Sequence, residues 1–308
     1  MVKHRLLPLL CLACGLPALA ADRIVADGAF SADSDGLRER SADLGYVHPL
    51  PSLGRQASLG VRAGYWLLAD NSDRIEFGTL KLDGQGRSGA LDWRARVQQF
   101  ASNGWSPSAG GFGFDYHAGS RWTVSTSGDF DLVDTVVAAR RHTRFNTWVL
   151  STDYAATPEL TLVGGVIGQW FSDGNHRLGG LAHVVYSPTA LPGFTAQLRV
   201  RRIDSEFRGL GYFSPDRLEE ALALLQYGHA VFGDRFVLTL VGGGGAQRVD
   251  GRDTAALYQG ELRGRGWFND HLGLEGRLGC TNTGGINVQA ASGGYRYCYG
   301  NLTLIGAF

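Results

Sequence analysis

Charged residues recur at every second position in several short segments of this sequence. Alternate side chains of a β-strand point to the same face, so each such set shares one face. Guanidinium groups in a row bind carboxylates or sugar hydroxyls through planar hydrogen bonds, whereas neighbouring arginine and glutamate can simply brace one another. Both interpretations stay open for the residues concerned: Arg62, Arg94, Arg96, Arg199, Arg201, Glu261, Arg263, Arg265, Glu275 and Arg277.

Tyrosines alternate in the last segment of the chain, at Tyr295, Tyr297 and Tyr299. Flat aromatic faces and planar polar groups suit saccharides, which present hydroxyl rims and C–H faces. We therefore include these tyrosines with the arginines among the residues predicted to line a polar channel.

Two cysteines remain beyond the leader described below, Cys280 and Cys298. They lie at equal distances from the middle of the loop predicted over Thr281–Gly294, and both share one strand face. Cross-strand partners must share a face, so we predict a disulfide. No His, Asp or Glu occurs between them, which disfavours a metal site.

Motifs of enzymes are missing from the sequence. It contains no G-x-S-x-G, no H-E-x-x-H and no paired cysteine ligands, and its histidines are scattered. The formal net charge is +0, so nothing indicates a nucleic-acid partner. We predict neither catalytic residues nor a metal or cofactor, although a spatial triad is invisible in a sequence.

Residues 1–20 have the features of a secretory signal peptide: a basic start, the apolar run Leu6–Leu16 and a small-x-small end at Ala18–Ala20. The exported chain, residues 21–308, is predicted to be one β-barrel domain. The composition agrees with this, since 45 residues are glycine, 11% are aromatic and no run reaches the roughly 20 apolar residues of a membrane helix.

Short segments in which apolar and polar residues alternate run through the whole exported chain, and residues typical of turns separate them. About sixteen strands at this spacing suit the antiparallel hairpins of a transmembrane barrel. We predict strands near Ile24–Phe30, Arg40–His48, Ala57–Leu67, Arg74–Leu82, Leu91–Phe100, Gly111–His117, Trp122–Leu132, Phe145–Ala155, Leu160–Phe171, Leu178–Ser187, Phe194–Ile203, Ala221–Val231, Phe236–Gln247, Ala255–Trp267, Leu272–Cys280 and Tyr295–Phe308.

The two faces of these strands differ in polarity. An arginine facing lipid costs about 2–4 kcal/mol at the bilayer midplane, so the charged faces, with Arg74 and Glu76 among them, are predicted to line the interior. Sixteen strands leave an aqueous channel. The faces assigned to lipid carry Leu59, Val61, Tyr65, Trp93, Val97, Trp148, Leu150, Leu198, Val200, Tyr258 and Leu262.

Connections between the predicted strands alternate in length. Short turns such as Ala118–Arg121 and Thr157–Glu159 alternate with long, polar loops such as Ser102–Gly110 and Asp204–Glu220. Outer-membrane barrels have short periplasmic turns on one rim and long extracellular loops on the other. The pattern therefore predicts a barrel with both chain ends on the periplasmic side.

Three motifs resemble the C-terminal barrels of bacterial cellulose and exopolysaccharide exporters: DTVVAARRHTR at 134–144, FSDGN at 171–175 and GYFSP at 211–215. The chain also ends like the closing strand of outer-membrane barrels, with Phe308 in the position of the C-terminal assembly signal. The resemblance implies a passive conduit for a cellulose-like or related glycan. Those exporters carry a periplasmic tetratricopeptide array before the barrel, whereas here the predicted strands begin almost at the signal-peptide junction. Two alternatives therefore stay open: the barrel works with a separate periplasmic scaffold protein, or it has another function.

Two interpretations stay open for the loop residues around the GYFSP motif. Tyr212 and Phe213 are costly to expose, so with Pro215 they either constrict the channel mouth or pack as a plug on neighbouring loops. The basic cluster of Arg140, Arg141, His142 and Arg144 is either solvated or binds phosphates of lipopolysaccharide or an anionic polymer.

The sequence thus predicts a barrel in the bacterial outer membrane that exports an exopolysaccharide. A general or solute-specific porin is the alternative, and a barrel enzyme such as a lipase, deacylase or protease is a further one. The predicted partners are the lipid bilayer, lipopolysaccharide, the barrel-assembly machinery and the polysaccharide cargo.

Overall fold

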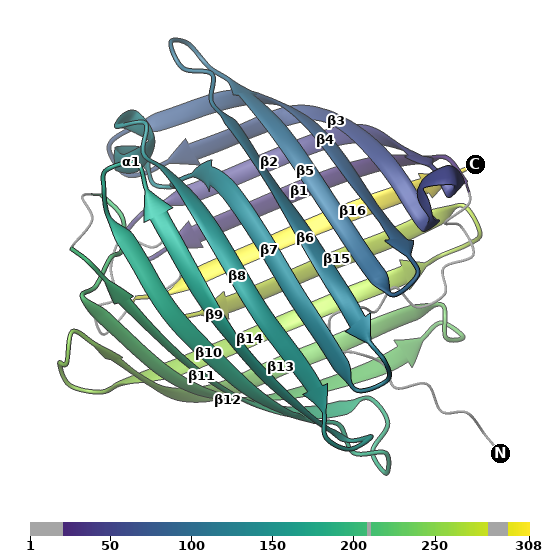
Figure 1. The fold of residues 1–308 in the computed structure, drawn as a ribbon. Coiled ribbons are helices and arrows are strands. Elements are labelled where there is room, and N and C mark those ends of the chain that lie inside the picture. The colour runs from purple at the N-terminus through teal and green to yellow at the C-terminus, as the bar shows by residue number, and fades with distance from the viewer. Residues whose placement is uncertain (1–20, 208–210, 283–294) are drawn as a thin grey trace.

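Sixteen antiparallel strands form a closed barrel in the computed structural model, which describes residues 21–207, 211–282 and 295–308 (Figure 1). The predicted signal peptide lies outside these residues. The strands are β1 (Arg23–Asp33), β2 (Arg38–Pro49), β3 (Arg55–Ala69), β4 (Arg74–Ser88), β5 (Leu91–Ala101), β6 (Ser108–Ala118), β7 (Trp122–Leu132), β8 (Arg144–Ala155), β9 (Leu160–Phe171), β10 (His176–Tyr186), β11 (Phe194–Ser205), β12 (Arg217–Val231), β13 (Phe236–Val249), β14 (Ala255–Trp267), β15 (Leu272–Thr281) and β16 (Tyr297–Ala307).

Each strand pairs with its neighbours in sequence, and β16 closes the ring against β1. Every predicted strand is present, and three of them have the predicted bounds, β7, β9 and β14. The predicted role of the last segment as the seam of the barrel is also confirmed, because β16 pairs with β15 on one side and β1 on the other. Closure leaves no strand edge unpaired, which a bilayer requires.

The outward face of the barrel is apolar. The residues assigned to lipid from the sequence lie on this face, and leucines from strands all around the ring are highly exposed there: Leu44, Leu80, Leu150, Leu198, Leu240, Leu262 and Leu302. The prediction for Arg74 and Glu76 was wrong. In β4 the inward positions are Ile75 and Phe77, which are buried, so Arg74 and Glu76 point outward as an exposed ion pair at 3.5 Å. They lie at the beginning of the strand, where an outward charge can reach water.

Two rims bound the barrel. The terminal rim carries the start of β1 and the end of β16, and the loop rim carries the short helix α1 (Val136–Arg140) at the opposite end (Figure 1). A 3-10 turn, η2 (Pro51–Leu53), connects β2 to β3 at the terminal rim. Within the described residues no helix has the length and apolar character needed to cross a bilayer.

The predicted strict alternation of short and long connections was too simple. Several loop-rim connections are as short as the turns of the terminal rim, among them residues 34–37, 70–73 and 172–175. The long loop-rim connections are residues 133–143, residues 206–216 and the connection after β15, most of which lies outside the described residues. Residues 133–143 and 211–215 meet at the barrel mouth, as described below.

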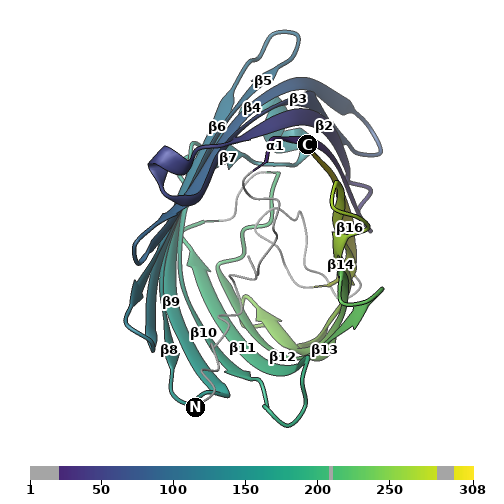
Figure 2. The same ribbon diagram turned by 90° about the vertical axis from the view of Figure 1, so that its right-hand side faces the viewer.

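The interior changes character along the barrel axis. Towards the loop rim, inward side chains of β3 to β7 form an apolar cluster with Val136 and Ala139 of α1. Figure 2 shows α1 among these strands in a view along the barrel. The cluster residues on the strands are Trp66, Leu68, Ile75, Phe77, Phe100, Ala109 and Leu132. Further along the axis the inward face is mixed. It carries ion pairs such as Lys81–Asp43, and on β12 to β14 it carries a buried apolar cluster of Leu222, Leu224, Val241 and Leu257. The apolar end therefore supports a packed structure in the mouth, and the ion-paired part of the wall is the polar part of the interior.

Candidate functional site

Two loops meet inside the mouth of the barrel at the loop rim. We call residues 133–143, residues 211–215 and Tyr295 together the stopper. Thr135 caps α1 by accepting a hydrogen bond from the Ala138 amide, and its hydroxyl donates to the Gly211 carbonyl at 2.5 Å. Gly211 has φ +93°, and a Cβ there would lie 2.6 Å from Val137 Cγ1. Glycine is therefore required for this close approach.

Tyr212 is the centre of the second loop. It is 3% exposed and stacks on Phe171 of β9 with ring centroids 4.6 Å apart. Its hydroxyl donates to Asp173 at 2.9 Å and accepts from the Asn175 amide at 3.2 Å. Asn175 also donates to Ser214 at 2.7 Å. Burial, reinforced by Asp173, raises the pKa of Tyr212, so the phenol stays protonated.

Arg177 supports this loop from β10. Its side chain is buried, and its guanidinium lies 4.7 Å from the centroid of Phe171 and 5.3 Å from that of Tyr212. It also donates a hydrogen bond to the Phe213 carbonyl. One cation thus contacts two stacked rings and one backbone acceptor, an arrangement that suits the planar, many-donor guanidinium.

Phe213 packs in a separate cluster of the mouth, with Ile203, Leu218 and Tyr295. Tyr295 was predicted to line the channel wall, but it precedes β16 and is 3% exposed within the stopper. Its hydroxyl donates to Asp33 at 3.4 Å. Pro215 is buried as well. Of the two readings of the GYFSP loop, the structure has the packed plug, and this plug lies across the mouth.

The segments that carry the family resemblance are thus neighbours in space. Residues 134–144 supply α1, residues 171–175 supply the partners of Tyr212, and residues 211–215 cross the mouth. Sequence reasoning treated them separately and missed Arg177, which follows the FSDGN motif by two positions. A buried arginine next to a predicted loop has no periodic signal, so only its surroundings identify it.

The basic cluster beside α1 is bonded within the protein. Arg140 makes a two-pronged pair with Asp73 at 2.7 and 2.9 Å, His142 stacks on Trp105 at 4.3 Å, and the Arg144 guanidinium lies 5.9 Å from the centre of the Trp105 ring. The Arg140 guanidinium lowers the pKa of Asp73. These contacts brace the stopper from outside, which neither sequence-based reading anticipated.

On the wall formed by β1 to β7, each predicted channel-lining arginine faces inward and is paired with acid. Arg62 lies 2.5 Å from Asp27 and 3.2 Å from Asp83. Arg94 pairs with Asp115 at 3.1 Å, and Arg96 lies 3.2 Å from Asp129. These contacts match the bracing interpretation. Lys81 and Asp43 form a further pair at 2.6 Å.

The wall formed by β11 to β16 holds the remaining predicted lining residues. Arg201 pairs with Glu220, and Arg263 pairs with Glu261, which also accepts a hydrogen bond from Tyr299. Arg265 stands opposite Glu275 in the register of β14 and β15. The remaining predicted lining residues on this wall have neutral partners. Arg199 donates a hydrogen bond to Gln197 at 2.7 Å, and Arg277 donates one to Asn301 at 2.9 Å. Tyr297 stacks on Tyr299 with ring centroids 5.7 Å apart.

One chain of hydroxyl, imidazole and carboxylate occurs on the inward face, as in a hydrolytic triad. His117 lies 3.1 Å from the Thr123 hydroxyl and 2.9 Å from Asp92. Arg87 already forms a fork with Asp92, which neutralises that carboxylate. Thr123 is the second residue of β7 and pairs with His117 within the β6–β7 ladder, where backbone N–H groups bond across the sheet instead of stabilising an oxyanion. The arrangement therefore carries no catalytic proposal.

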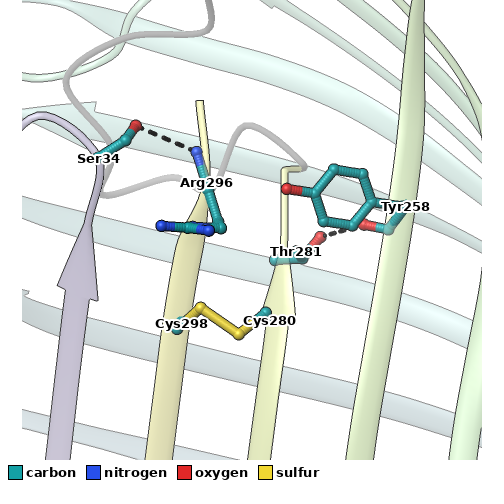
Figure 3. Close-up of a disulfide and its surroundings, with 6 residues drawn as sticks. All are labelled: Ser34, Tyr258, Cys280, Thr281, Arg296 and Cys298. Carbon is teal, nitrogen blue, oxygen red and sulfur yellow. Dashed lines mark hydrogen bonds between the residues drawn. A yellow bond between two sulfur atoms is a disulfide. The ribbon is translucent and has the colours of Figure 1, made fainter. Parts of the chain in front are cut away.

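Cys280 and Cys298 are joined by a disulfide at the loop-rim ends of β15 and β16 (Figure 3). They are direct partners in the register, with Cα atoms 4.1 Å apart and a separation of 18 positions in sequence. Nearby, the Arg296 amide bonds to Ser34 and Thr281 donates to the Tyr258 carbonyl. The disulfide thus closes the hairpin next to the seam of the barrel. Among the described residues no group of side chains suits a metal ion.

Replacing both cysteines by serine is expected to lower the free energy of unfolding by about 3 kcal/mol. The chain-entropy model gives this value for a loop of similar length. Urea unfolding in detergent micelles, followed by tryptophan fluorescence with and without a reductant, measures the effect. An oxidised wild type no more stable than the variant would contradict the expectation.

Phe308 follows β16 and is 66% exposed, and its amide donates to the Asp22 carbonyl at 3.1 Å. The side chain is thus presented at the terminal rim beside the start of β1. Its role as an assembly signal stays a prediction.

No family model matches the chain, and no curated protein matches its sequence. Solved structures do match its fold. A bacterial polysaccharide outer membrane secretin aligns with a TM-score of 0.73 and 12% identity over 94% of this chain and 99% of that one. CdiB from Acinetobacter baumannii gives a TM-score of 0.47 at 11% identity, covering 94% and 60%. The outer membrane protein OprD from Pseudomonas aeruginosa gives 0.46 at 10%, covering 96% of each. This chain is a closed β-barrel of sixteen strands over the described residues, with the fold of a polysaccharide outer membrane secretin.

Proposed function

We propose that this barrel is a passive conduit through which a polysaccharide chain leaves the cell. The observation that carries the proposal is the stopper: the segments that resemble exopolysaccharide exporters pack against one another at the loop-rim mouth of a barrel with many inward polar side chains. By the convention of outer-membrane barrels the terminal rim is periplasmic and the loop rim extracellular. Cargo would then enter at the polar end and leave past the stopper.

A hydroxyl-rich chain suits the polar part of the interior. Side chains such as Gln197, Asn301 and Tyr299 present donors and acceptors on the inward face, and neighbouring ion pairs add fixed dipoles. A sugar chain can exchange its hydrogen bonds with water for hydrogen bonds with these side chains at little cost in free energy. A passive conduit needs no catalytic residue.

A general porin is the competing function. Uptake of small solutes requires a mouth that is open at rest, whereas Tyr212, Phe213 and Tyr295 are buried across this one. A packed mouth favours a channel that opens only for its cargo. This difference separates the two functions experimentally.

Deletion of the gene in its native host is expected to trap the glycan in the periplasm and to abolish it outside the cell. The measurement is glycan content in periplasmic and extracellular fractions, with the wild-type gene supplied in trans as control. An unchanged glycan distribution, together with reduced uptake of small solutes, would replace the export function by the porin. Lipopolysaccharide, the assembly machinery and a separate scaffold remain predicted partners.

A further inference from the structure

The two walls of the channel differ in how their arginines are partnered. On the β1 to β7 wall, Arg62, Arg94 and Arg96 each contact a carboxylate. On the β11 to β16 wall, Arg199 and Arg277 hydrogen-bond to the amide oxygens of Gln197 and Asn301 instead. An amide orients a guanidinium without neutralising it. Net positive charge therefore lies on one wall.

The two amide-held arginines lie near a third. Arg263 stands directly opposite Arg277 in the register of β14 and β15, and its charge also acts on Arg199. Glu261 is 5% exposed, with one oxygen bonded to Arg263 and the other to Tyr299. Both oxygens of this carboxylate are thus occupied, while Arg199 and Arg277 bond to amides.

Aromatic surface adjoins this charge. The Arg277 guanidinium lies 5.5 Å from the centroid of Tyr299, and Tyr297 stacks on Tyr299 at 5.7 Å. Guanidinium forks bind carboxylates in two-pronged fashion, and aromatic faces contact the C–H face of a sugar ring. Both elements occur together on the inward face of β11 to β16.

We infer that this wall binds carboxylate groups of an acidic polysaccharide, with Arg199 and Arg277 as the principal ligands and Tyr299 as a platform for a sugar ring. The inference rests on the proposed function and specifies the class of cargo. The chain would orient its carboxylates towards β11 to β16 and its neutral edges towards the braced wall. Weak binding of this kind, repeated along the chain, lets a polymer slide.

Binding of trigalacturonate to the full-length protein in detergent, measured by isothermal titration calorimetry at low salt, tests the inference. Cellotriose is the neutral comparison of equal length, and inorganic phosphate is the simple anion. Wild type is expected to bind trigalacturonate at least tenfold more tightly than cellotriose or phosphate. This preference should weaken in 0.5 M salt, because screening reduces attraction between charges.

The variant R199Q/R277Q removes two charges without leaving a carboxylate unpaired, since both arginines have amide partners. It is expected to lose at least tenfold in affinity for trigalacturonate and to keep that for cellotriose. The matched control R94Q removes a charge from the opposite wall and should bind as wild type does. Folding of each variant is checked on gels, where a folded barrel migrates differently before and after heating. If the double variant does not fold, the single variants R199Q and R277Q take its place in the binding measurement.

Equal binding of all three probes, no binding of trigalacturonate, or the same loss in R94Q would overturn the inference. Glycan secretion is a separate readout of the proposed function. If the native glycan still requires the protein for secretion while trigalacturonate does not bind, the class of cargo is wrong and export stands.

Discussion

Replacing Arg177 by alanine is expected to raise the ion conductance of the purified barrel at least tenfold. The buried guanidinium contacts Phe171 and Tyr212 and donates to the Phe213 carbonyl. Its removal leaves that carbonyl without this donor and the two rings without the cation. An unpaired buried carbonyl costs about 1–3 kcal/mol and a lost cation–π contact about 0.5–2 kcal/mol, which together are enough to shift a packed loop towards open states.

Single-channel recording in planar bilayers measures this effect, and sensitivity of cells to a large antibiotic excluded by the outer membrane gives a second readout. The exposed Arg202 on the outward face serves as the matched control, because it pairs only with Asp204 at 2.9 Å and Glu219 at 4.0 Å. R202A should behave as wild type. A folded R177A barrel with wild-type conductance would show that the stopper does not depend on this residue.

The largest loss of stability is expected from Lys81→Met. Lys81 lies 2.6 Å from Asp43, whose side chain is 4% exposed, and Thr79 also donates to Asp43 at 3.0 Å. Without Lys81 the buried carboxylate loses its counter-charge, which costs about 3–5 kcal/mol when a buried pair is broken on one side. Urea unfolding in detergent micelles, followed by tryptophan fluorescence, measures the loss.

The double variant D43N/K81M tests the cause. Removing both charges should restore most of the stability, because replacing a buried pair by neutral groups is often close to neutral in free energy. If the double variant is as unstable as K81M, the loss comes from packing of the lysine stem and not from the unpaired charge.

Comparing stability with ligand binding in these variants distinguishes the roles of the arginines on the two walls of the channel. Arg62 and Lys81 are braces, and removing them should lower stability. Arg199 and Arg277 have neutral partners, so their removal should change ligand binding more than stability. A stability loss in R199Q/R277Q as large as that of K81M would show that these arginines are braces as well.

Periodicity alone determined the strands, their faces and their order. Each strand carries its own signal, since side chains alternate between lipid and interior at every position. That signal placed all sixteen strands and brought Cys280 opposite Cys298 in adjacent hairpins. The alternation gave the wrong face for Arg74 and Glu76. These residues lie at a strand end, where a charged side chain reaches water on either face, so the free energies of the two orientations are similar.

Tertiary structure alone decided what fills the mouth and which charges are partnered. Thr135 contacts Gly211, and Arg177 contacts Tyr212, across 76 and about 35 positions of sequence, and no local pattern encodes such distances. Likewise, Arg94 and Arg199 look equivalent as inward arginines, yet one meets a carboxylate and the other an amide. A strand's period sets only which way a side chain points. Its partner is set by the register of neighbouring strands and by loops that fold back into the barrel, and these depend on the closed ring as a whole.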